Sequence, residues 1–501
     1  MQGSAGTAPA QRSAIPPGGA ELLFPEIDGR RSTTATAQAI LADAARAADP
    51  SLAQAIEGSR RWRADYIPFV RGLTTLAAEP DRALALARAG VDSMRRRLVL
   101  EGGGEIAPLS DAFASPAPAP TIGTGEIHGA QARVERLELP YRGELLHGGA
   151  LLDQLDRWVA GGIAEPSVAD AVALVAEHPE WLALPGRTIA LIGAGSEIGP
   201  FAPLCAWGVD VLAIDLPDRS VWERIGAVAR GGSGRVRIPV AADGTRGLDV
   251  VGDLARTRAW LSSNLGDAEP VLGMYGYADG GAHVLLTGAF DALACDLAAA
   301  HPESALAYLA TPTDAYLVPD DAVERARTAW RGRRARRVLQ APLKLVSGNR
   351  LYRPAYADGM PVADALVAQQ GPNYALAKRL QRWRGMLERS RGRRVSFNVA
   401  PATWTRSVIK NRVLAAAYAG AGHFGIEIFD PATTRVLMAA LLVHDLHAEP
   451  RADGSPEGLF SEGATHGGLW TAAYETRSAL GIAALAGLPA TMLGRAGRAA
   501  G

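Results

Sequence analysis

From Gly186 onward, short apolar runs alternate with stretches of helical periodicity, and this alternation limits the folds open to the chain. A strand buried on both faces reads as a continuous apolar run, and the helices between such strands cover the two faces of a parallel sheet. We therefore expect an α/β domain with a doubly wound parallel sheet. The predicted strands are Thr188–Ile192, Asp210–Ile214, Asp249–Val251, Pro270–Met274, Ala305–Leu309 and Arg394–Val399.

The rest of the chain is predicted to be mainly helical, with few strands. Helical spacing runs from Thr33 to Leu100 and returns at about Ala150–Val159 and Ser167–Glu177. Gly102–Gly125 is predicted as a linker or a long loop, and Arg133–Pro140 as a short strand. The predicted segments are a disordered tail at 1–30, a mostly helical N-terminal region at 31–180, the sheet domain at 186–430 with a long insertion at 314–371, and a helical C-terminal extension at 431–501.

The composition narrows the classes of function. Lysine and arginine number 52 and are balanced by 52 aspartate and glutamate residues, so no net charge attracts the chain to nucleic acids or to anionic membranes. Cys205 and Cys295 are too few for a disulfide framework, and we expect them as thiols in a reducing cytoplasm. Met1–Gly19 lacks the apolar core of a signal peptide, and the uncharged run Ser478–Gly494 is short for a membrane span.

A glycine-rich turn follows the first predicted strand of the sheet. Glycines at such a turn let backbone N–H groups approach a pyrophosphate, so the turn predicts a dinucleotide site. Asp215 ends the second strand, where a carboxylate accepts hydrogen bonds from an adenosine ribose and repels a 2′-phosphate; we therefore expect NAD(H) in preference to NADP(H). A tight turn with a helix cap is the structural alternative. The turn consists of Gly193, Ala194, Gly195, Ser196, Glu197, Ile198 and Gly199.

Tyr374 and Lys378 lie four residues apart in a stretch with helical periodicity, and hence on one helix face. A phenol is a poor acid or base at neutral pH, but a neighbouring ammonium lowers its pKa, so the pair is suited to moving a proton to or from a carbonyl oxygen. The spacing is common by chance. It carries more weight here because the chain has only three lysines, Lys344, Lys378 and Lys410, among its 52 basic residues.

In the residues of these motifs and in their order along the chain, the chain resembles the short-chain dehydrogenase/reductase family over about Gly186 to Lys410. The resemblance implies a Rossmann fold and an NAD(P)-dependent oxidoreductase of the ketoreductase type. It implies that Tyr374 donates or accepts the proton and that Lys378 holds the nicotinamide ribose. It further implies cofactor contacts by Asp253 and Leu254 near the adenine, by Tyr275 and Gly276 after the fourth strand, and by Pro401 after the sixth.

The sequence departs from the family pattern at several positions. Glu197 replaces the middle glycine of the turn, which again favours NAD(H), and Met274-Tyr275-Gly276 stands where the family carries Asn-Ala-Gly. The family's catalytic serine has no clear counterpart. Thr311, at the end of the fifth strand, is our first candidate for that hydroxyl, with Thr313 and Ser347 as the alternatives.

Two charged clusters allow more than one interpretation. Arg331–Arg337 is expected to be a solvated helix face, or alternatively a clamp for the phosphates of a coenzyme A or carrier-protein thioester, or a nucleic-acid contact. His444, Asp445, His447 and His466 are too few and too loosely spaced to predict a metal site, and we expect no metal.

The function that we expect is an NAD(H)-dependent oxidoreductase that interconverts a ketone and a secondary alcohol on a bulky, fairly apolar small molecule. A lyase, dehydratase or epimerase that keeps its NAD, and a non-catalytic nucleotide-binding scaffold, are the alternatives. The sequence leaves the oligomeric state open and is compatible with a homo-oligomer.

Overall fold

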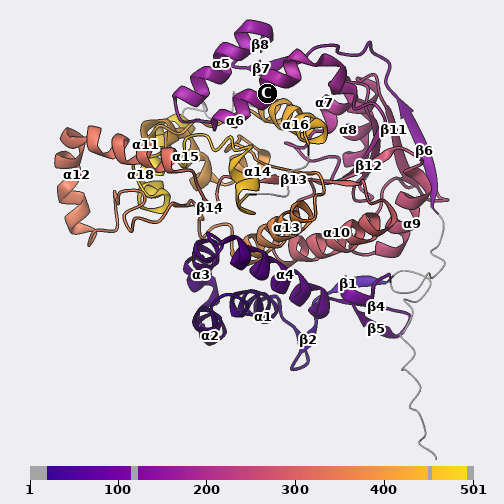
Figure 1. The fold of residues 1–501 in the computed structure, drawn as a ribbon, viewed down its shortest axis with the longest axis horizontal. Helices are drawn as coiled ribbons and strands as arrows, with labels where there is room; N and C mark the ends of the chain where they lie inside the picture. Colours follow the sequence, from indigo (N-terminus) through magenta and orange to yellow (C-terminus); the bar gives the residue numbers. More distant parts are fainter. Residues whose placement is uncertain (1–19, 114–121, 450–453, 493–501) are drawn as a thin grey trace, which may run out of the picture.

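The computed structural model describes residues 20–113, 122–449 and 454–492, and its centre is a seven-stranded sheet (Figure 1). The order across the sheet is β16-β13-β12-β9-β10-β11-β6, with all neighbours parallel except β11 and β6. Counted along the chain from β9, this is the Rossmann order, which reverses direction between β9 and β12. The strands are β6 (Gly123–His128), β9 (Arg187–Ile192), β10 (Asp210–Ile214), β11 (Arg235–Val240), β12 (Glu269–Met274), β13 (Ala305–Ala310) and β16 (Val395–Val399).

Helices cover both faces of this sheet, as the sequence predicts. Alternate residues of the strands join two separate apolar cores, one under α9 (Leu254–Asn264), α10 (Gly281–Ala300) and α13 (Pro372–Ser390), the other under α7, α8 and α16. Figure 1 shows the first set below the sheet and the second above it. The second set has the bounds α7 (Phe201–Ala206), α8 (Arg219–Arg230) and α16 (Pro431–His447), with α5 (Gly148–Ala160) and α6 (Pro166–Glu177) outside it.

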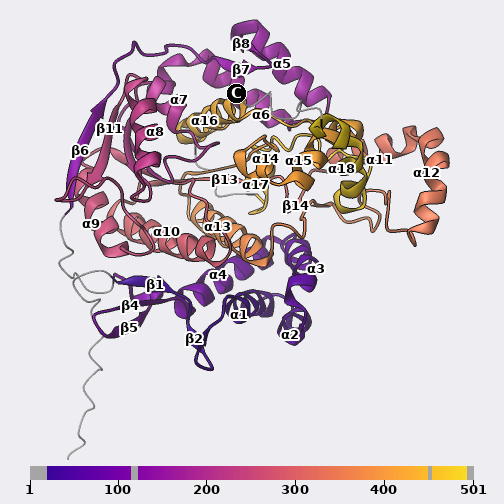
Figure 2. The ribbon, with the colours of Figure 1, turned by 180° about the vertical axis from the view of Figure 1, so that it is seen from behind.

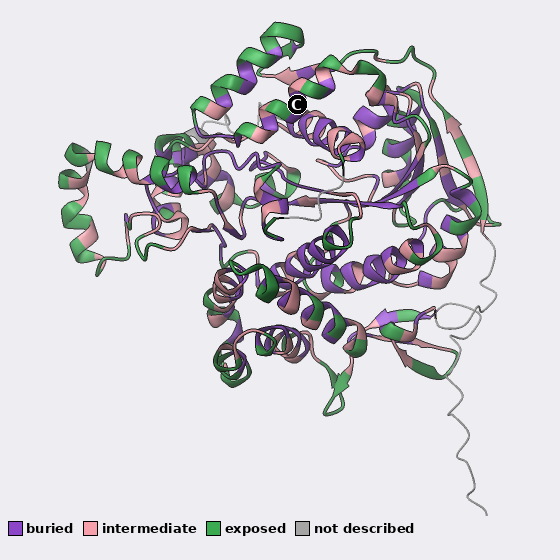
Figure 3. Ribbon diagram, in the orientation of Figure 1, coloured by how far each residue is buried: buried purple, intermediate pink, exposed green. Residues whose placement is uncertain are grey.

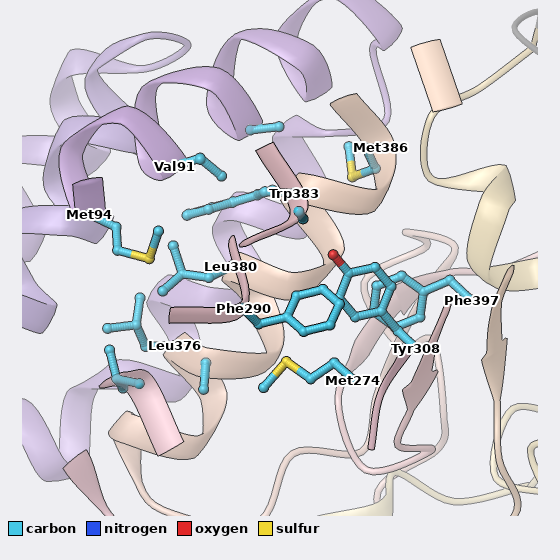
Figure 4. Close-up of a cluster of buried hydrophobic side chains, with 14 of the residues drawn as sticks. Val91, Met94, Met274, Phe290, Tyr308, Leu376, Leu380, Trp383, Met386 and Phe397 are labelled. Atoms are coloured by element: carbon cyan, nitrogen blue, oxygen red, sulfur yellow. The ribbon is translucent and has the colours of Figure 1, made fainter. Parts of the chain in front are cut away.

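The N-terminal region adds a further layer beneath α10 and α13 (Figures 1 and 2). Three of its helices begin at residues that favour a helix start: Ser32 and Asp49 accept backbone N–H groups at the starts of α1 and α2, and Pro80 opens α4. The apolar side chains of α4 meet those of α13, α10 and the sheet in one cluster (Figure 4). The helices are α1 (Thr33–Arg46), α2 (Pro50–Gly58), α3 (Trp62–Leu76) and α4 (Pro80–Arg97).

The insertion leaves the sheet after β13 and returns at α13. It starts and ends with a two-stranded ribbon, and between these strands α11 and α12 project away from the body (Figure 1). The remaining elements lie in the C-terminal part of the chain, where α15 and α18 pack together. These elements are β14 (Ala315–Leu317), α11 (Asp320–Gly332), α12 (Arg334–Val346), β15 (Val362–Asp364), α14 (Arg406–Lys410), α15 (Arg412–Gly420), α17 (Gly458–Ser461) and α18 (Thr476–Met492).

One predicted strand of the sheet is wrong. Asp249–Val251 is a turn in which the Asp249 carboxylate accepts the Val251 N–H, and the third strand is instead β11. In β11 charged and apolar residues alternate and Pro239 interrupts the pattern, so it does not read as a buried strand. Its partner β6 begins at the end of the stretch predicted as a linker, at Gly123, and closes the edge of the sheet.

Two further predictions outside the sheet domain need correction. Residues 20–30 of the predicted tail form β1 (Glu21–Leu23) and the start of a hairpin of β2 (Glu26–Ile27) and β3 (Arg30–Arg31), with Leu22 fully buried; residues 1–19 lie outside the described residues. Most of Arg133–Pro140 is irregular. The short strands of these regions are β4 (Val99–Gly102), β5 (Glu105–Pro108), β7 (Leu139–Tyr141) and β8 (Glu144–Leu146).

One described helix, α10, is long and apolar enough by composition to cross a membrane, but it packs between the sheet, α13 and the N-terminal layer. Its apolar surface is therefore used within the fold, and most of its length is buried.

The contact between α4 and α13 gives a first prediction. A Cβ atom added at Gly90 would lie 2.1 Å from the Trp383 ring, so Gly90→Ala must displace a rigid side chain in the core. We expect a loss of about 1–3 kcal/mol in the free energy of unfolding, measured by urea denaturation. Gly72→Ala is the matched control, because that Cβ would make only ordinary contact with Leu52. A Gly90→Ala variant as stable as Gly72→Ala would contradict this packing.

Candidate active site

The register of the sheet brings the ends of three strands level. Ile192 of β9 pairs with Ile214 of β10 on one side and with Met274 of β12 on the other. The residues that follow these strands therefore start at the same edge. In a parallel sheet of this order, ligands bind outside the carboxyl ends of the strands at the point where the order reverses.

The glycine-rich turn is packed closely against the loop after β12. Gly193 has a φ of +83°, and a Cβ atom there would lie 2.3 Å from the backbone of Gly276. Only glycine fits such a conformation and such an approach without strain. The close contact is the structural reason for Gly193, and it sets the turn directly beside the start of the β12 loop.

The turn also presents free backbone donors. Gly195 donates its N–H to Asp215, at 2.8 Å, and Ser196 donates to the carbonyl of Gly193. Within the part of the chain that the structure describes, the N–H groups of Glu197 and Ile198 donate no hydrogen bond. Two adjacent free N–H groups in a turn are suited to an anion.

Asp215 has a structural task in addition to the predicted one. Its two carboxylate oxygens accept the N–H groups of Gly195 and Leu216, and burial raises the pKa of this carboxyl despite these two bonds. Each carboxylate oxygen has a second lone pair, so Asp215 retains the capacity to accept a ribose hydroxyl.

Glu197 bonds to the chain rather than facing an open site. Its Oε2 accepts the backbone N–H of Arg406 at 2.9 Å, and so caps the start of α14. The same carboxylate attracts the guanidinium of Arg435, on α16, whose pKa is lowered by burial. Arg435 is half-buried and makes no hydrogen bond or ion pair with any described residue, which leaves its five donors available beside the turn.

Tyr374 and Lys378 lie on one face of α13, as predicted, and reach the carboxyl edge of the sheet. The Lys378 ammonium lies 5.9 Å from the centre of the Tyr374 ring and donates to the carbonyl of Leu309, near the end of β13, at 3.2 Å. The Tyr374 ring also lies 6.1 Å from that of Tyr277, which directly follows Gly276 in the loop after β12. The structure thus brings the Tyr–Lys pair and the glycine-rich turn against adjacent residues of one short loop, Tyr277 and Gly276.

The titration of the pair differs from the sequence prediction. Burial raises the pKa of Tyr374 above its ordinary value, and a hydrogen bond with the Thr311 side chain offsets this in part. Burial lowers the pKa of Lys378 to about 8. Desolvation therefore outweighs the expected effect of the ammonium on the phenol, and at pH 7 the phenol is protonated while the lysine is mostly charged.

Among the three hydroxyls considered for the family serine, Thr311 is the one whose side chain acts on the phenol, because it lowers the pKa of Tyr374. Thr313 lies behind it, 2.9 Å from the Thr311 hydroxyl, and accepts a hydrogen bond from Gln370. Ser347 lies at the end of α12, where its hydroxyl donates to the carbonyl of Lys344.

The remaining predicted residues have structural roles, in capping a helix or in packing. Asp253 caps α9 by accepting the Arg256 N–H, and it also forms an ion pair with Arg256 at 3.0 Å. Leu254, Tyr275 and Pro401 are buried at the edge of the sheet, where the carbonyl of Pro401 accepts the Thr403 hydroxyl. Leu254 and Tyr275 belong to the apolar core.

Two residues that the sequence analysis did not single out, Tyr277 and His283, complete the surroundings of the phenol. His283, in the first turn of α10, stacks against Tyr374 with ring centres 5.6 Å apart. It is 1% exposed, and neither ring nitrogen has a hydrogen-bond partner among the described residues. Burial and the charge of Lys378 lower the pKa of His283 to about 3, so this ring is neutral. Tyr277 lies in the loop after the fourth strand, and no comparable sequence signal marks His283.

The histidines considered for a metal site have other partners. His444 lies 3.1 Å from Asp445, and the buried His466 lies 3.1 Å from Glu165. Among the described residues, no group of three or more histidine, cysteine, aspartate or glutamate side chains is arranged to hold a metal ion.

The comparisons with known proteins add no relative. No protein-family model matches the chain, and a search of curated proteins finds no match. The resemblance to the short-chain dehydrogenase/reductase family therefore rests on the motifs and on the order of the strands.

The buried His283 gives a prediction on pH. Its folded pKa of about 3 lies below the ordinary 6.5, so the unfolded chain binds an extra proton as the pH falls below 6.5 and stability is lost. At pH 5 this loss is roughly 2 kcal/mol relative to pH 7. We expect His283→Phe to remove that part of the pH dependence in urea denaturation, whereas His147→Phe, at an exposed position, retains it. Equal slopes for both variants would refute the assignment.

Proposed function

We propose that the protein is an NAD(H)-dependent oxidoreductase that reduces a ketone to a secondary alcohol. The observation that carries this proposal is the grouping of Tyr374, Lys378 and Thr311 at the carboxyl edge of the sheet, one loop away from the glycine-rich turn. A proton donor and a dinucleotide cradle at the reversal point of a Rossmann sheet form the arrangement that hydride transfer to a carbonyl requires.

The residues around the turn fit the charge of a dinucleotide. The free N–H groups of Glu197 and Ile198 and the unpaired guanidinium of Arg435 would face the diphosphate, since guanidinium groups pair with phosphate through two parallel hydrogen bonds. Asp215 would accept the adenosine ribose and disfavour a 2′-phosphate. When bound, the nicotinamide supplies the hydride.

The protonation states suit the proton transfer that reduction requires. Because its pKa is raised, Tyr374 holds its proton at neutral pH and would donate it to the carbonyl oxygen of the substrate. Thr311 orients the phenol, and the charged Lys378 stabilises the phenolate left after transfer. His283 is neutral and adds no competing charge to the wall of the site.

A nucleotide-binding scaffold without catalysis is the second candidate. The observation in its favour is Glu197, whose carboxylate lies in the turn and is held by the backbone of Arg406. A carboxylate at this point opposes the negative charge of a diphosphate. The two candidates differ in the outcome of binding and turnover measurements.

The proposal is tested first by cofactor binding. We expect calorimetry to show that NADH binds and that NADPH binds more weakly. Arg435→Gln should weaken NADH binding by about tenfold or more, the contribution of a hydrogen bond to a charged group. Arg412→Gln, an exposed arginine on α15, is the matched control and should bind NADH as the wild type does. If neither cofactor binds, the oxidoreductase assignment fails.

The second test concerns the phenol. In a screen of apolar ketones followed by NADH absorbance, we expect Tyr374→Phe to lower kcat by about a hundredfold or more while the NADH affinity stays unchanged. Tyr141→Phe, which removes a hydroxyl bonded to Glu427, is the control and should turn over normally. Undiminished turnover by Tyr374→Phe would overturn the role of the phenol. Tightly held NAD without net turnover by the wild type would favour a lyase, dehydratase or epimerase.

A further inference from the structure

Helix α12 exposes its apolar side to solvent. The helix lies at the outer end of the insertion, where it forms the edge of the molecule in Figure 1, and Figure 3 shows it as mostly exposed. Large apolar side chains on a soluble helix normally face the core. On α12 five of them are 52% to 87% exposed, namely Val338, Leu339, Leu343, Leu345 and Val346.

The polar side of the same helix faces the protein. The guanidinium of Arg337 lies 5.0 Å from the centre of the Trp330 ring, and the Lys344 ammonium lies 5.8 Å from it. Gln340 accepts the hydroxyl of Tyr474 at 2.9 Å. These contacts fix the rotation of α12, so the outward apolar face is a consequence of specific packing.

The segment that carries α12 is strongly basic. Residues 325–357 contain nine arginines, one lysine and no aspartate or glutamate, although the whole chain is neutral. Arg331 and Arg353 pair with acids from outside this segment. Arg334 and Arg350 are exposed and have no ion pair among the described residues. An apolar face with an unpaired cation near each of its ends matches an anionic and apolar partner.

We propose that α12 docks the protein onto membranes that contain anionic phospholipid. A helix with an apolar face and flanking arginines lies in the plane of the interface, with the apolar side chains among the acyl chains and the cations at the phosphates. Because α12 projects from the body, it can reach a flat surface without a clash from the rest of the fold (Figures 1 and 2).

The charge of the segment argues against a second copy of this chain as the partner. A two-fold dimer through α12 would place the same patch against itself and bring like charges together. Without acidic residues in 325–357, such an interface would have no opposite charge within the segment to pair with them. A membrane of anionic lipid supplies that charge.

The test is sedimentation of the full chain with lipid vesicles. We expect the wild type to bind vesicles of mixed phosphatidylglycerol and phosphatidylcholine but not vesicles of phosphatidylcholine alone, and to be released at about 0.5 M salt. The double variant L339E/L345E should bind the mixed vesicles at least about tenfold more weakly than the wild type. NADH binding reports whether the variant is folded, and it separates this proposal from the function of the active site.

The matched control is I106E/L145E, which introduces the same two negative charges at exposed apolar positions in β5 and β8, away from α12. It should bind the mixed vesicles as the wild type does. The proposal would be overturned if the wild type did not bind these vesicles, or if L339E/L345E bound them equally well. It would also be overturned by a wild-type dimer in sedimentation velocity that L339E/L345E converts to a monomer, since α12 would then be an interface between copies.

Discussion

Buried charge pairs tie helix α13, which carries the Tyr–Lys pair, to three other parts of the fold. Arg382 is fully buried and pairs with Asp314, at the start of the insertion, and with Glu457, in the C-terminal part of the chain. Arg384 pairs in the same way with Asp291 of α10 at 2.6 Å. A buried charge that loses its partner costs several kcal/mol. The helix is therefore stable only when the insertion, α10 and the C-terminal segment are all in position.

This dependence explains how an insertion of such length leaves the site intact. The chain departs from β13 immediately after Thr311, and Asp314 is tied to α13 within three residues of it. At the far end of the insertion the chain enters the first turn of α13, which carries Tyr374. Both ends are thus held against one helix. The Thr311 hydroxyl and the Tyr374 phenol lie close together because the backbone near each of them is held against α13, while the residues between them extend outward.

The sequence predicts the part of this architecture that depends on local pattern. Buried strands such as β9 and β12 read as apolar runs, and the spacing of Tyr374 and Lys378 is visible without any structure. Properties that depend on distant segments are not visible. The raised pKa of Tyr374 comes from burial under elements from several parts of the chain. His283 belongs to no spaced motif, and only the packing of α10 beside α13 shows that it stacks on the phenol.

The insertion links the two proposals made for this protein. Its inner end begins beyond Thr311, beside the proposed proton donor Tyr374, and its outer end is α12 with the apolar face turned to solvent. An apolar ketone partitions into a bilayer, where its concentration exceeds that in water. A reductase bound to the membrane through this insertion would take such a substrate directly from the bilayer. The exposure of apolar side chains, which costs solubility in a free protein, is then explained by the location of the substrate.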